Sequence, residues 1–490
     1  MTERFPDSPV FTGWEAPQRF EGDIYDLEID GEIPPDLDGA LFRVTPDRQY
    51  PPRFDNDIFF NGDGSVSSFR IKDGHVDFKV RYIRTPRYLS EHQARRSLFG
   101  MYRNPFTDDP SVAGLSRSTG NTNVVVHNGL LWALKEDSLP YAMDPETLET
   151  IGESNFAGQI RSRTFTAHPK WDPRTGDMYC FGYEARGLAT PDLAYYVIDP
   201  AGVVRHEAWF RMPYPGMVHD MALTENHVIF PIMPFSSSLE RMKAGGQHWV
   251  WEPDVDVYFG VIPRNGGGED VRWFHAPNAF PGHTINAFED KGKIYLDVLL
   301  VTGRTFFPWW PDAQGRTGDA MNGDVMRIEI DLRRRDLIAE PTVLTPIIAD
   351  LPAVDDRYVS TSYRHAYLTT ADPAALEMPV RAKPYNGYFT GFLHVDAHTG
   401  AVRGTWAPGA LATVQEPVFV PRDSTAAEGE GYLMAVVNRH DEVRSELVVL
   451  DSTRIDAGPI ATARLPFRMK NGIHGSWADA TQFRPRMVEG

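Results

Sequence analysis

Short β-type segments recur along nearly the whole chain, and this recurrence limits the possible fold more than any other feature. Apolar and β-branched runs alternate with turns rich in Gly, Pro, Asp and Asn, whereas long helical periodicity is scarce. Units made of a strand pair, an Asp-Pro or Asp-Gly type turn and a return strand favour the radially repeated sheets of an all-β propeller. We count seven such units, which begin at residues 64, 130, 177, 227, 293, 388 and 432.

Four longer segments interrupt the repeat. Residues 84–106 and 237–247 have some helical spacing, while 302–322 and 361–387 are rich in aromatic residues, Pro and Gly. Insertions of this length in a compact scaffold are often functional loops or lids. We therefore expect the four segments to form a cap over one face. Because no composition shift marks a linker, residues 1–490 are interpreted as a single domain.

The charge balance and the cysteine content limit the partners and the compartment. The chain has 49 Lys and Arg residues against 67 Asp and Glu, a formal net charge of −18, which opposes binding to nucleic acid or to an anionic membrane. No run approaches the roughly 18 apolar residues of a membrane helix, and the first residues do not have the pattern of a signal peptide. The single cysteine, Cys180, lies in the apolar run MYCFGY and is interpreted as a core residue. We expect a cytoplasmic protein that binds neither nucleic acid nor membrane.

Three histidines share one context at the boundary between units. His168, His219 and His283 each open a short strand that a polar turn follows. The first strand of each propeller blade lines the central axis, so equivalent positions in successive units can converge on one point. His474, in NGIHGSWAD, lies in the segment that must return to close the ring and would supply a fourth side chain. Four unrelated histidines with ordinary hydrogen bonds remain the alternative at this point.

Four converging imidazoles predict a particular kind of metal site. Imidazole is the commonest ligand of transition metals near neutral pH. Zinc would be coordinatively closed by four such ligands, whereas iron(II), which prefers six, would retain two open positions for dioxygen or substrate. If the four imidazoles converge, the expected cofactor is one catalytic Fe(II), with O2 as the cosubstrate.

Several motifs of the chain resemble those of the carotenoid cleavage oxygenases, non-haem iron enzymes that split carbon–carbon double bonds. The motifs extend over nearly the whole sequence: FFNGDGSVSSF (59–69), NTNVVVHNGLLWALKED (121–137), GHTINAFED (282–290), EPVFVPRD (416–423) and GIHGSWAD (472–479). The resemblance implies a seven-bladed β-propeller with a loop and helix cap over the iron. It also implies that the four histidines named above are the iron ligands.

The same resemblance assigns roles around the ligands. It implies that Glu136, Glu377 and Glu416 accept hydrogen bonds from ligand imidazoles, which would fix their tautomers and offset part of the metal charge. Thr122 corresponds to a threonine near one open iron position. For Glu136 and Glu416 the alternative is an ordinary strand-end carboxylate, and for Thr122 an ordinary β-forming residue.

Two further segments, SLFGMYRNP and ALKED, resemble the branch of that family that cleaves phenolic alkenes, the lignostilbene dioxygenases and isoeugenol oxygenases. The resemblance implies that Tyr102 and Lys135 bind the 4-hydroxyl of the substrate and favour its phenolate. Strict strand alternation would place Lys135 and Glu136 on opposite faces, so the strand is expected to end or twist there. A solvent-exposed lysine is the alternative for Lys135.

The function predicted from the sequence is an Fe(II)-dependent dioxygenase that cleaves the interphenyl double bond of a 4-hydroxystilbene into two aromatic aldehydes. Phe59, Phe306 and Phe307 are candidates for aromatic residues of the substrate cavity. The alternatives are cleavage of a propenyl phenol such as isoeugenol, cleavage of an apocarotenoid, and a non-enzymatic propeller that binds a ligand and a structural metal. The expected partner is thus a small phenolic alkene, and the sequence leaves a homodimer open.

Overall fold

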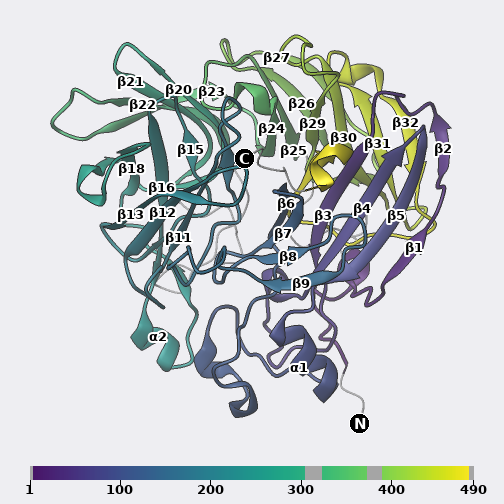
Figure 1. Cartoon of the computed structure of the whole chain (residues 1–490), viewed down its shortest axis with the longest axis horizontal. Helices are drawn as coiled ribbons and strands as arrows, with labels where there is room; N and C mark the ends of the chain where they lie inside the picture. The colour runs from purple at the N-terminus through teal and green to yellow at the C-terminus, as the bar shows by residue number, and fades with distance from the viewer. Residues whose placement is uncertain (1–3, 304–322, 372–388, 485–490) are drawn as a thin grey trace.

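Seven antiparallel sheets are arranged in a ring in the computed structural model of the chain (Figure 1). The structure describes residues 4–303, 323–371 and 389–484. Within these ranges most of the regular structure is β-strand, with only short helices between the sheets. The all-β, seven-bladed propeller expected from the repeated units is therefore confirmed.

The first three sheets contain the strands from the N-terminal part of the chain except β2, together with one strand from its C-terminal end. Sheet one contains β1 (Gly22–Ile24), β5 (His75–Tyr82), β4 (Gly64–Lys72), β3 (Gly39–Pro46) and β33 (Gly475–Asp479). Sheet two contains β6 (Asn123–His127), β7 (Leu130–Leu134), β8 (Tyr141–Met143) and β9 (Thr150–Glu153). Sheet three contains β10 (Lys170–Trp171), β11 (Met178–Tyr183), β12 (Asp192–Ile198) and β13 (Val204–Arg211).

The other four sheets follow in chain order. Sheet four contains β14 (Gly216–Met217), β15 (Ala222–Leu223), β16 (His227–Ser237), β17 (Trp249–Trp251), β18 (Val257–Pro263) and β19 (Arg272–Ala276). Sheet five contains β20 (Ala279–Asp290), β21 (Lys293–Thr302), β22 (Asp324–Asp331) and β23 (Ala339–Thr345). Sheet six contains β24 (Ala349–Val354), β25 (His365–Thr370), β26 (Gly391–Asp396) and β27 (Val402–Trp406). Sheet seven contains β28 (Ala412–Val414), β29 (Val418–Pro421), β30 (Gly431–Arg439), β31 (Arg444–Asp451), β32 (Pro459–Arg464) and β2 (Glu28–Gly31).

The ring is closed by an exchange of strands between sheets one and seven. The C-terminal strand β33 pairs with β3, with Gly39 opposite Asp479. In the other direction, the N-terminal strand β2 pairs with β32, with Glu28 opposite Arg464. The segment that carries His474 thus returns to the start of the chain, as the sequence predicts.

Packing between neighbouring sheets explains why many strands are continuous apolar runs. Every residue of β11 (MYCFGY) is buried, and so is every residue of β30 (GYLMAVVNR) except the last. This is because each sheet is covered on both faces. One such core, between sheets one and seven, contains Leu41, Phe69 and Val436. Cys180 is fully buried in β11, in agreement with its interpretation as a core residue.

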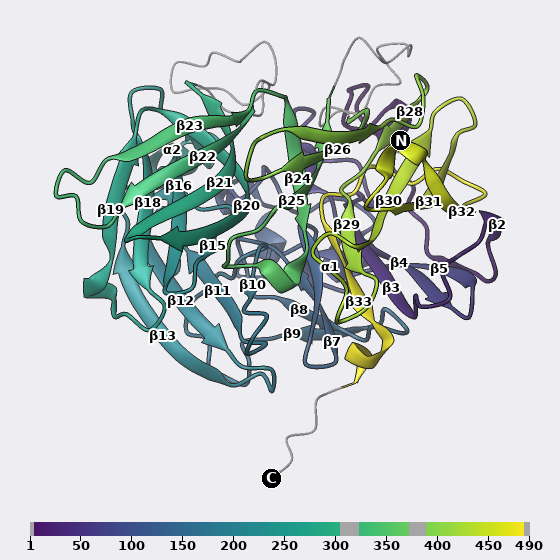
Figure 2. The ribbon, with the colours of Figure 1, turned by 90° about the horizontal axis from the view of Figure 1, so that it is seen from above.

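Two short helices lie in the segments in which the sequence predicts helical structure. α1 (Pro86–Ala94) begins after Thr85, whose hydroxyl caps it, and α2 (Leu239–Lys243) begins after Ser238 in the same way. Figure 1 shows both helices at the same edge of the ring, and Figure 2 gives the view from above. Asn104 joins the two segments, because its Nδ2 donates to the carbonyl of Met242 in α2 at 3.0 Å and to that of Gly246 after α2 at 2.7 Å.

The other two insertions fall largely outside the described ranges, at 304–322 and 372–388. The cap and the single-domain interpretation therefore stay predictions. In the part of the chain that the structure describes, no helix has the length and apolar character required to cross a membrane.

Candidate metal centre

The four predicted histidines meet in the middle of the ring, and their ligand atoms all lie within 4.8 Å of one another. The Nε2 atoms of His168 and His219 are 3.1 Å apart, those of His219 and His283 are also 3.1 Å apart, and those of His283 and His474 are 3.2 Å apart. The four side chains come from four different sheets or from the segments that enter them. They are buried or nearly so, which makes this a preformed cluster of donors.

The local backbone brings each imidazole to the axis. His168 precedes β10 and His474 directly precedes β33, as expected for strand-opening residues, while His219 lies between β14 and β15. His283 differs, because it lies inside the long strand β20. There the pairing with β21 shifts register between Pro281 and Thr284, and such a bulge redirects a side chain.

Two of the predicted carboxylates contact the far nitrogens of ligand imidazoles. Glu136 Oε1 lies 2.5 Å from Nδ1 of His219, and Glu416 Oε1 lies 2.7 Å from Nδ1 of His474. The second oxygen of Glu416 accepts from Nη1 of Arg43 and from the backbone N–H of Gly475, both at 2.8 Å. Both glutamates are therefore placed as partners of the predicted ligands.

The third carboxylate is an aspartate that the sequence interpretation missed. Asp350 Oδ1 lies 2.7 Å from Nδ1 of His283, and the same oxygen accepts from the N–H of Leu351 at 2.8 Å. The residue predicted for such a role, Glu377, lies outside the described residues. A signal for Asp350 was present, because it stands near the start of β24, in the first strand of its sheet, where other sheets carry the histidines.

Electrostatics favour ionised carboxylates and mostly neutral imidazoles. Burial alone would raise the pKa of Glu136 and of Glu416, but the neighbouring histidines and arginines outweigh it, so both pKa values are lowered. Burial lowers the pKa of His168 well below the ordinary value, with the other histidines adding to the effect, and it also lowers the pKa of His474. For His283 burial acts in the same direction, but Asp350 outweighs it and the pKa is raised.

The donor set fits a transition-metal cation. An imidazole whose Nδ1–H donates to a carboxylate presents an unprotonated Nε2, so three lone pairs are fixed toward the centre by hydrogen bonding. Lone pairs held at separations of 3.1–3.2 Å repel one another unless a cation lies between them. Neutral imidazole nitrogens suit iron, zinc and copper rather than magnesium or calcium.

Lys135 and Tyr102 are brought together beside this centre. β7 ends at Leu134, so Lys135 and Glu136 follow the strand rather than alternate within it. Lys135 is only 4% exposed, which excludes a solvent-exposed lysine. Its Nζ lies 4.9 Å from the centroid of the Tyr102 ring and donates to Asn121 Oδ1 at 2.8 Å and to the carbonyl of Phe60 at 3.1 Å.

The remaining predicted site residues have mixed placements. Thr122 is buried, and its backbone N–H donates to the carbonyl of Leu134 at 3.0 Å, next to Lys135. Phe59 is 2% exposed and packs in a cluster with Val10 and Phe11. Phe306 and Phe307 lie outside the described residues.

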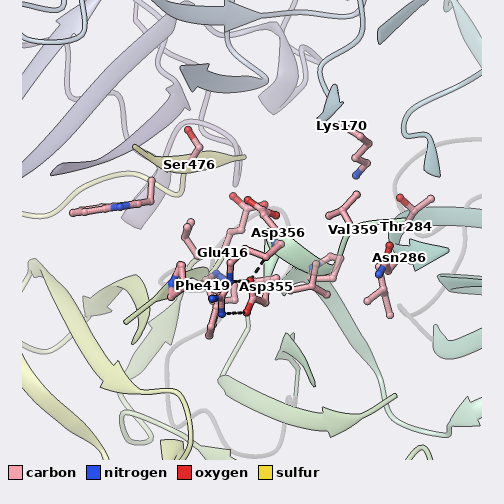
Figure 3. Close-up of a pocket in the computed structure, with 18 of the residues that line it drawn as sticks. Lys170, Thr284, Asn286, Asp355, Asp356, Val359, Glu416, Phe419 and Ser476 are labelled. Carbon is pink, nitrogen blue, oxygen red and sulfur yellow. Dashed lines mark hydrogen bonds and ion pairs between the residues drawn. The ribbon is translucent and has the colours of Figure 1, made fainter. Parts of the chain in front are cut away.

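Hydrogen bonds that were not predicted connect the three segments that carry His168, His219 and His283. Asp220, next to His219, accepts from Lys170 Nζ at 2.9 Å and from the N–H and hydroxyl of Thr284 at 2.9 and 2.8 Å. Lys170 and Thr284 also line a cavity of about 350 Å³ that Glu416 reaches (Figure 3). In Figure 3, Lys170 and Ser476 lie on opposite sides of this cavity.

Known proteins resemble the chain over almost its full length. A resveratrol cleavage oxygenase of Aspergillus fumigatus is 48% identical over 488 residues, which cover 98% of this chain and 97% of that protein. An isoeugenol monooxygenase of Pseudomonas putida is 44% identical and covers 96% of this chain, with 98% of its own length matched. The crystal structure of a lignostilbene dioxygenase from Pseudomonas brassicacearum superposes with a TM-score of 0.95 at 46% identity, covering 98% of this chain and all of that one.

The family comparison agrees with these pairwise matches. The model of the family described as retinal pigment epithelial membrane protein, RPE65, matches residues 15–479. This range includes all four histidines of the centre and their three carboxylate partners. The chain therefore belongs to the RPE65 family, the carotenoid oxygenases that its sequence motifs resemble.

Proposed function

We propose that the protein is an Fe(II)-dependent dioxygenase that cleaves the interphenyl double bond of 4-hydroxystilbenes into two aromatic aldehydes. The observation that carries the proposal is the convergence of four imidazole Nε2 atoms, three of them on rings whose Nδ1 contacts a carboxylate. Bound iron would supply the binding and activation of dioxygen at the positions that four imidazoles leave open. Each alkene carbon receives one oxygen atom, so O2 balances the reaction without a further reductant.

The substrate class rests on the relatives and on two side chains. Proteins named for resveratrol, isoeugenol and lignostilbene are 44–48% identical to this chain. Lys135 is buried and directly precedes Glu136, and its Nζ lies 4.9 Å from the ring centroid of the partly buried Tyr102, so a phenol held by the two would place its conjugated double bond toward the metal centre. The protein would act on a small phenolic alkene in the cytoplasm.

The two side chains have different tasks in binding the phenol. Burial raises the pKa of Tyr102, so this residue remains a neutral hydrogen-bond donor. Burial lowers the pKa of Lys135 to about 8, so it is still mostly an ammonium at neutral pH. Two of its three N–H groups contact Asn121 and Phe60, and among the described residues the third has no acceptor. That N–H would bind the phenolate oxygen, and the phenolate would donate electron density to the alkene.

The surrounding residues would support this arrangement without taking part in bond cleavage. Thr122 would lie near an open position of the metal, and Phe59, Phe306 and Phe307 remain candidates for the walls of the substrate cavity. Glu136, Asp350 and Glu416 would keep the imidazoles in the tautomer that binds the metal.

Product analysis with a panel of alkenes tests the proposal. The panel contains 4-hydroxystilbene, its 4-methoxy analogue, isoeugenol and an apocarotenal, with iron content measured on the same preparation. We expect about one iron per chain and two aromatic aldehydes from 4-hydroxystilbene, with little product from the methyl ether. Faster cleavage of isoeugenol would favour the propenyl-phenol alternative, which the 44% identical relative supports. If iron-loaded protein released no aldehyde from any of these alkenes, the remaining alternative would be a non-enzymatic propeller that binds a ligand.

A lysine variant tests how the phenol is activated. Lys135→Met keeps much of the side chain but removes its charge, so kcat/KM for 4-hydroxystilbene should fall by roughly 100-fold or more, the scale for a positioned electrostatic group. Iron content should not change. Tyr102→Phe should cost less, because it removes a hydrogen bond and no charge.

The matched control is Lys293→Met. Lys293 is on β21, outside the metal centre, and forms an ion pair with Glu329, so its replacement should leave kcat/KM unchanged. Both Lys135→Met and Tyr102→Phe should discriminate less between the phenol and its methyl ether. Equal rates for the two substrates with the unmodified enzyme would exclude phenolate formation from the mechanism.

A further inference from the structure

A chain of buried hydrogen bonds continues outward from one ligand imidazole beyond its carboxylate. Glu136 uses Oε1 for Nδ1 of His219, while its other oxygen, Oε2, accepts from the hydroxyl of Tyr183 at 2.5 Å. The hydroxyl oxygen of Tyr183 in turn accepts from Nη1 of Arg103 at 2.6 Å. Each of these groups thus has its position fixed by the next one outward.

Arg103 is held by several contacts of its own. Its side chain is 1% exposed, and Nη2 donates to Glu184 Oε2 at 2.9 Å. The guanidinium carbon lies 5.2 Å from the ring centroid of Tyr183 and 5.1 Å from that of Trp249, so two aromatic rings pack against it. His248 contacts both Glu184, at 3.0 Å, and the backbone carbonyl of Arg103, also at 3.0 Å.

The backbone of Arg103 has a conformation that the surroundings must enforce. Its φ of 55° lies in the left-handed region, which residues other than glycine rarely adopt. Such a conformation persists where neighbouring contacts determine it, and it is found preferentially at functional positions. Here it lets the side chain of Arg103 turn toward Tyr183 while the preceding residue, Tyr102, packs against Lys135.

The hydrogen bond from Tyr183 has a chemical effect on the metal ligand. A donor on Oε2 withdraws electron density from the carboxylate of Glu136, so this carboxylate attracts the Nδ1 proton of His219 less strongly. It also fixes the plane of the carboxylate and through it the plane of the imidazole. Removing the donor would therefore change both the orientation and the donor strength of His219.

We propose that Tyr183 is a positioning residue that acts on His219 through Glu136, and that Arg103 couples this arm of the metal centre to the loop carrying Tyr102. The first part concerns metal binding alone and is independent of the substrate. The second part rests on the proposed function, because it assigns Tyr102 to the phenol.

The first part is tested by titrating metal-free protein with cobalt(II) and measuring the visible absorption of the bound ion. Tyr183→Phe keeps the ring and removes only the hydroxyl. We expect it to weaken cobalt(II) binding by about 3- to 10-fold, below the roughly 10- to 100-fold typical for direct partners of a ligand, and to shift the absorption bands. The matched control is Tyr195→Phe on the neighbouring strand β12, which removes an equally buried hydroxyl that donates to the carbonyl of Arg264.

A double-mutant cycle distinguishes action through Glu136 from a general loss of packing. In a Glu136→Gln background, Tyr183→Phe should weaken cobalt(II) binding by less than about 2-fold more, because the group it acts on is already altered. If Tyr183→Phe weakened cobalt(II) binding by the same factor in the Glu136→Gln background as in the unmodified protein, the proposal would be overturned. So would a Tyr183→Phe variant whose affinity and absorption match those of Tyr195→Phe.

The second part is tested by the split between kcat and KM. Arg103→Lys keeps a positive charge but cannot contact Tyr183 and Glu184 together. We expect a KM for 4-hydroxystilbene raised by about 5-fold or more and a lower kcat, whereas Tyr183→Phe should lower kcat with little change in KM. Arg264→Lys, at a buried arginine paired with Asp172, is the control for folding. An unchanged KM in folded Arg103→Lys would refute the coupling, while absence of stilbene cleavage by the unmodified enzyme would refute the proposed function and leave the cobalt result standing.

Discussion

The four histidines of the centre differ in the group that contacts Nδ1, the imidazole nitrogen that faces away from the centre. Nδ1 of His283 contacts Asp350, whereas Nδ1 of His219 and of His474 contacts a glutamate that also interacts with a buried arginine. Within the described residues, no carboxylate contacts Nδ1 of His168. Among the residues that the structure describes, the four ligands thus form a graded series: one has no carboxylate partner, two have a glutamate that also interacts with an arginine, and one has an aspartate without an arginine partner.

The directions of the pKa shifts follow this series at its two ends. The pKa of His168 is lowered well below its ordinary value by burial and by the other histidines. The pKa of His283 is raised, because the charge of Asp350 outweighs the effect of burial. An arginine beside a carboxylate cancels part of its charge, so Glu136 and Glu416 pull less on their imidazoles than Asp350 does. Burial lowers the pKa of both imidazoles, and the charge of Asp350 reverses the direction of the shift for His283.

The largest effect is expected from removing a histidine, and it would show whether all four ligands are equally necessary for metal binding despite their different carboxylate partners. Replacement of any one of the four histidines by Ala should abolish iron retention and turnover, because a lost ligand changes both affinity and geometry. Iron analysis and aldehyde assays on the purified variants check this. If His168→Ala alone kept full activity, the imidazole without a carboxylate would not be a ligand. Full activity in two variants would remove the metal-site proposal.

A smaller effect is expected when the carboxylates are changed. Glu136→Gln, Asp350→Asn and Glu416→Gln should each weaken metal affinity by roughly 10- to 100-fold, with the largest loss for Asp350→Asn. Metal competition with a chelator measures this order. Asp297→Asn is the control, because it alters an equally buried carboxylate that pairs with Arg327 and Tyr363 away from the metal centre. Equal losses in all three variants would show that the arginines do not differentiate the ligands.

The smallest effect concerns pH in the metal-free protein. The raised pKa of His283 favours its protonated form, so this form stabilises the metal-free fold below the ordinary histidine value of about 6.5, and the stabilisation is lost as pH rises through the raised pKa. The proton must leave before Nε2 can bind a metal, so cobalt(II) uptake should weaken as pH falls through that pKa. Asp350→Asn lowers the pKa of His283 and should shift the midpoint of uptake to lower pH, although its affinity at higher pH is weaker. An unshifted midpoint would contradict the assignment of the raised pKa to Asp350.

The sequence was most informative where chemistry and repetition coincide. The strand units predicted the seven sheets, and the recurrence of His168, His219 and His283 at unit boundaries led to the cluster that the structure contains. Glu136 was assigned through the resemblance of its motif to the family, because a carboxylate at the end of a strand does not by itself indicate a role beside a metal ligand. Asp350 was missed, because its place near the start of the first strand of its sheet was the only signal, and nothing in the sequence showed that it faces an imidazole 67 residues away.

The contacts of Tyr183 and Arg103 could not be predicted for a related reason. Tyr183 belongs to the apolar run MYCFGY, in which a tyrosine is an ordinary core residue. Its hydroxyl has a role only because sheet two brings Glu136 to it and the loop after α1 brings Arg103 to it, over separations of 47 and 80 residues. Pairings of this kind depend on how the sheets are arranged in three dimensions.

The strand exchange that closes the ring has a consequence for the order of biosynthetic events. His474 is in place only when β33 has paired with β3, and its partner Glu416 contacts Arg43 across 373 residues of sequence. Contacts so distant in the chain form late and slowly, because a long loop must close before they stabilise anything. A growing chain that lacks its last strand has three of the four imidazoles. A metal ion would then enter a chain that has already closed its ring rather than nucleate the folding, so maturation of the centre would depend on metal supplied after the ring has closed.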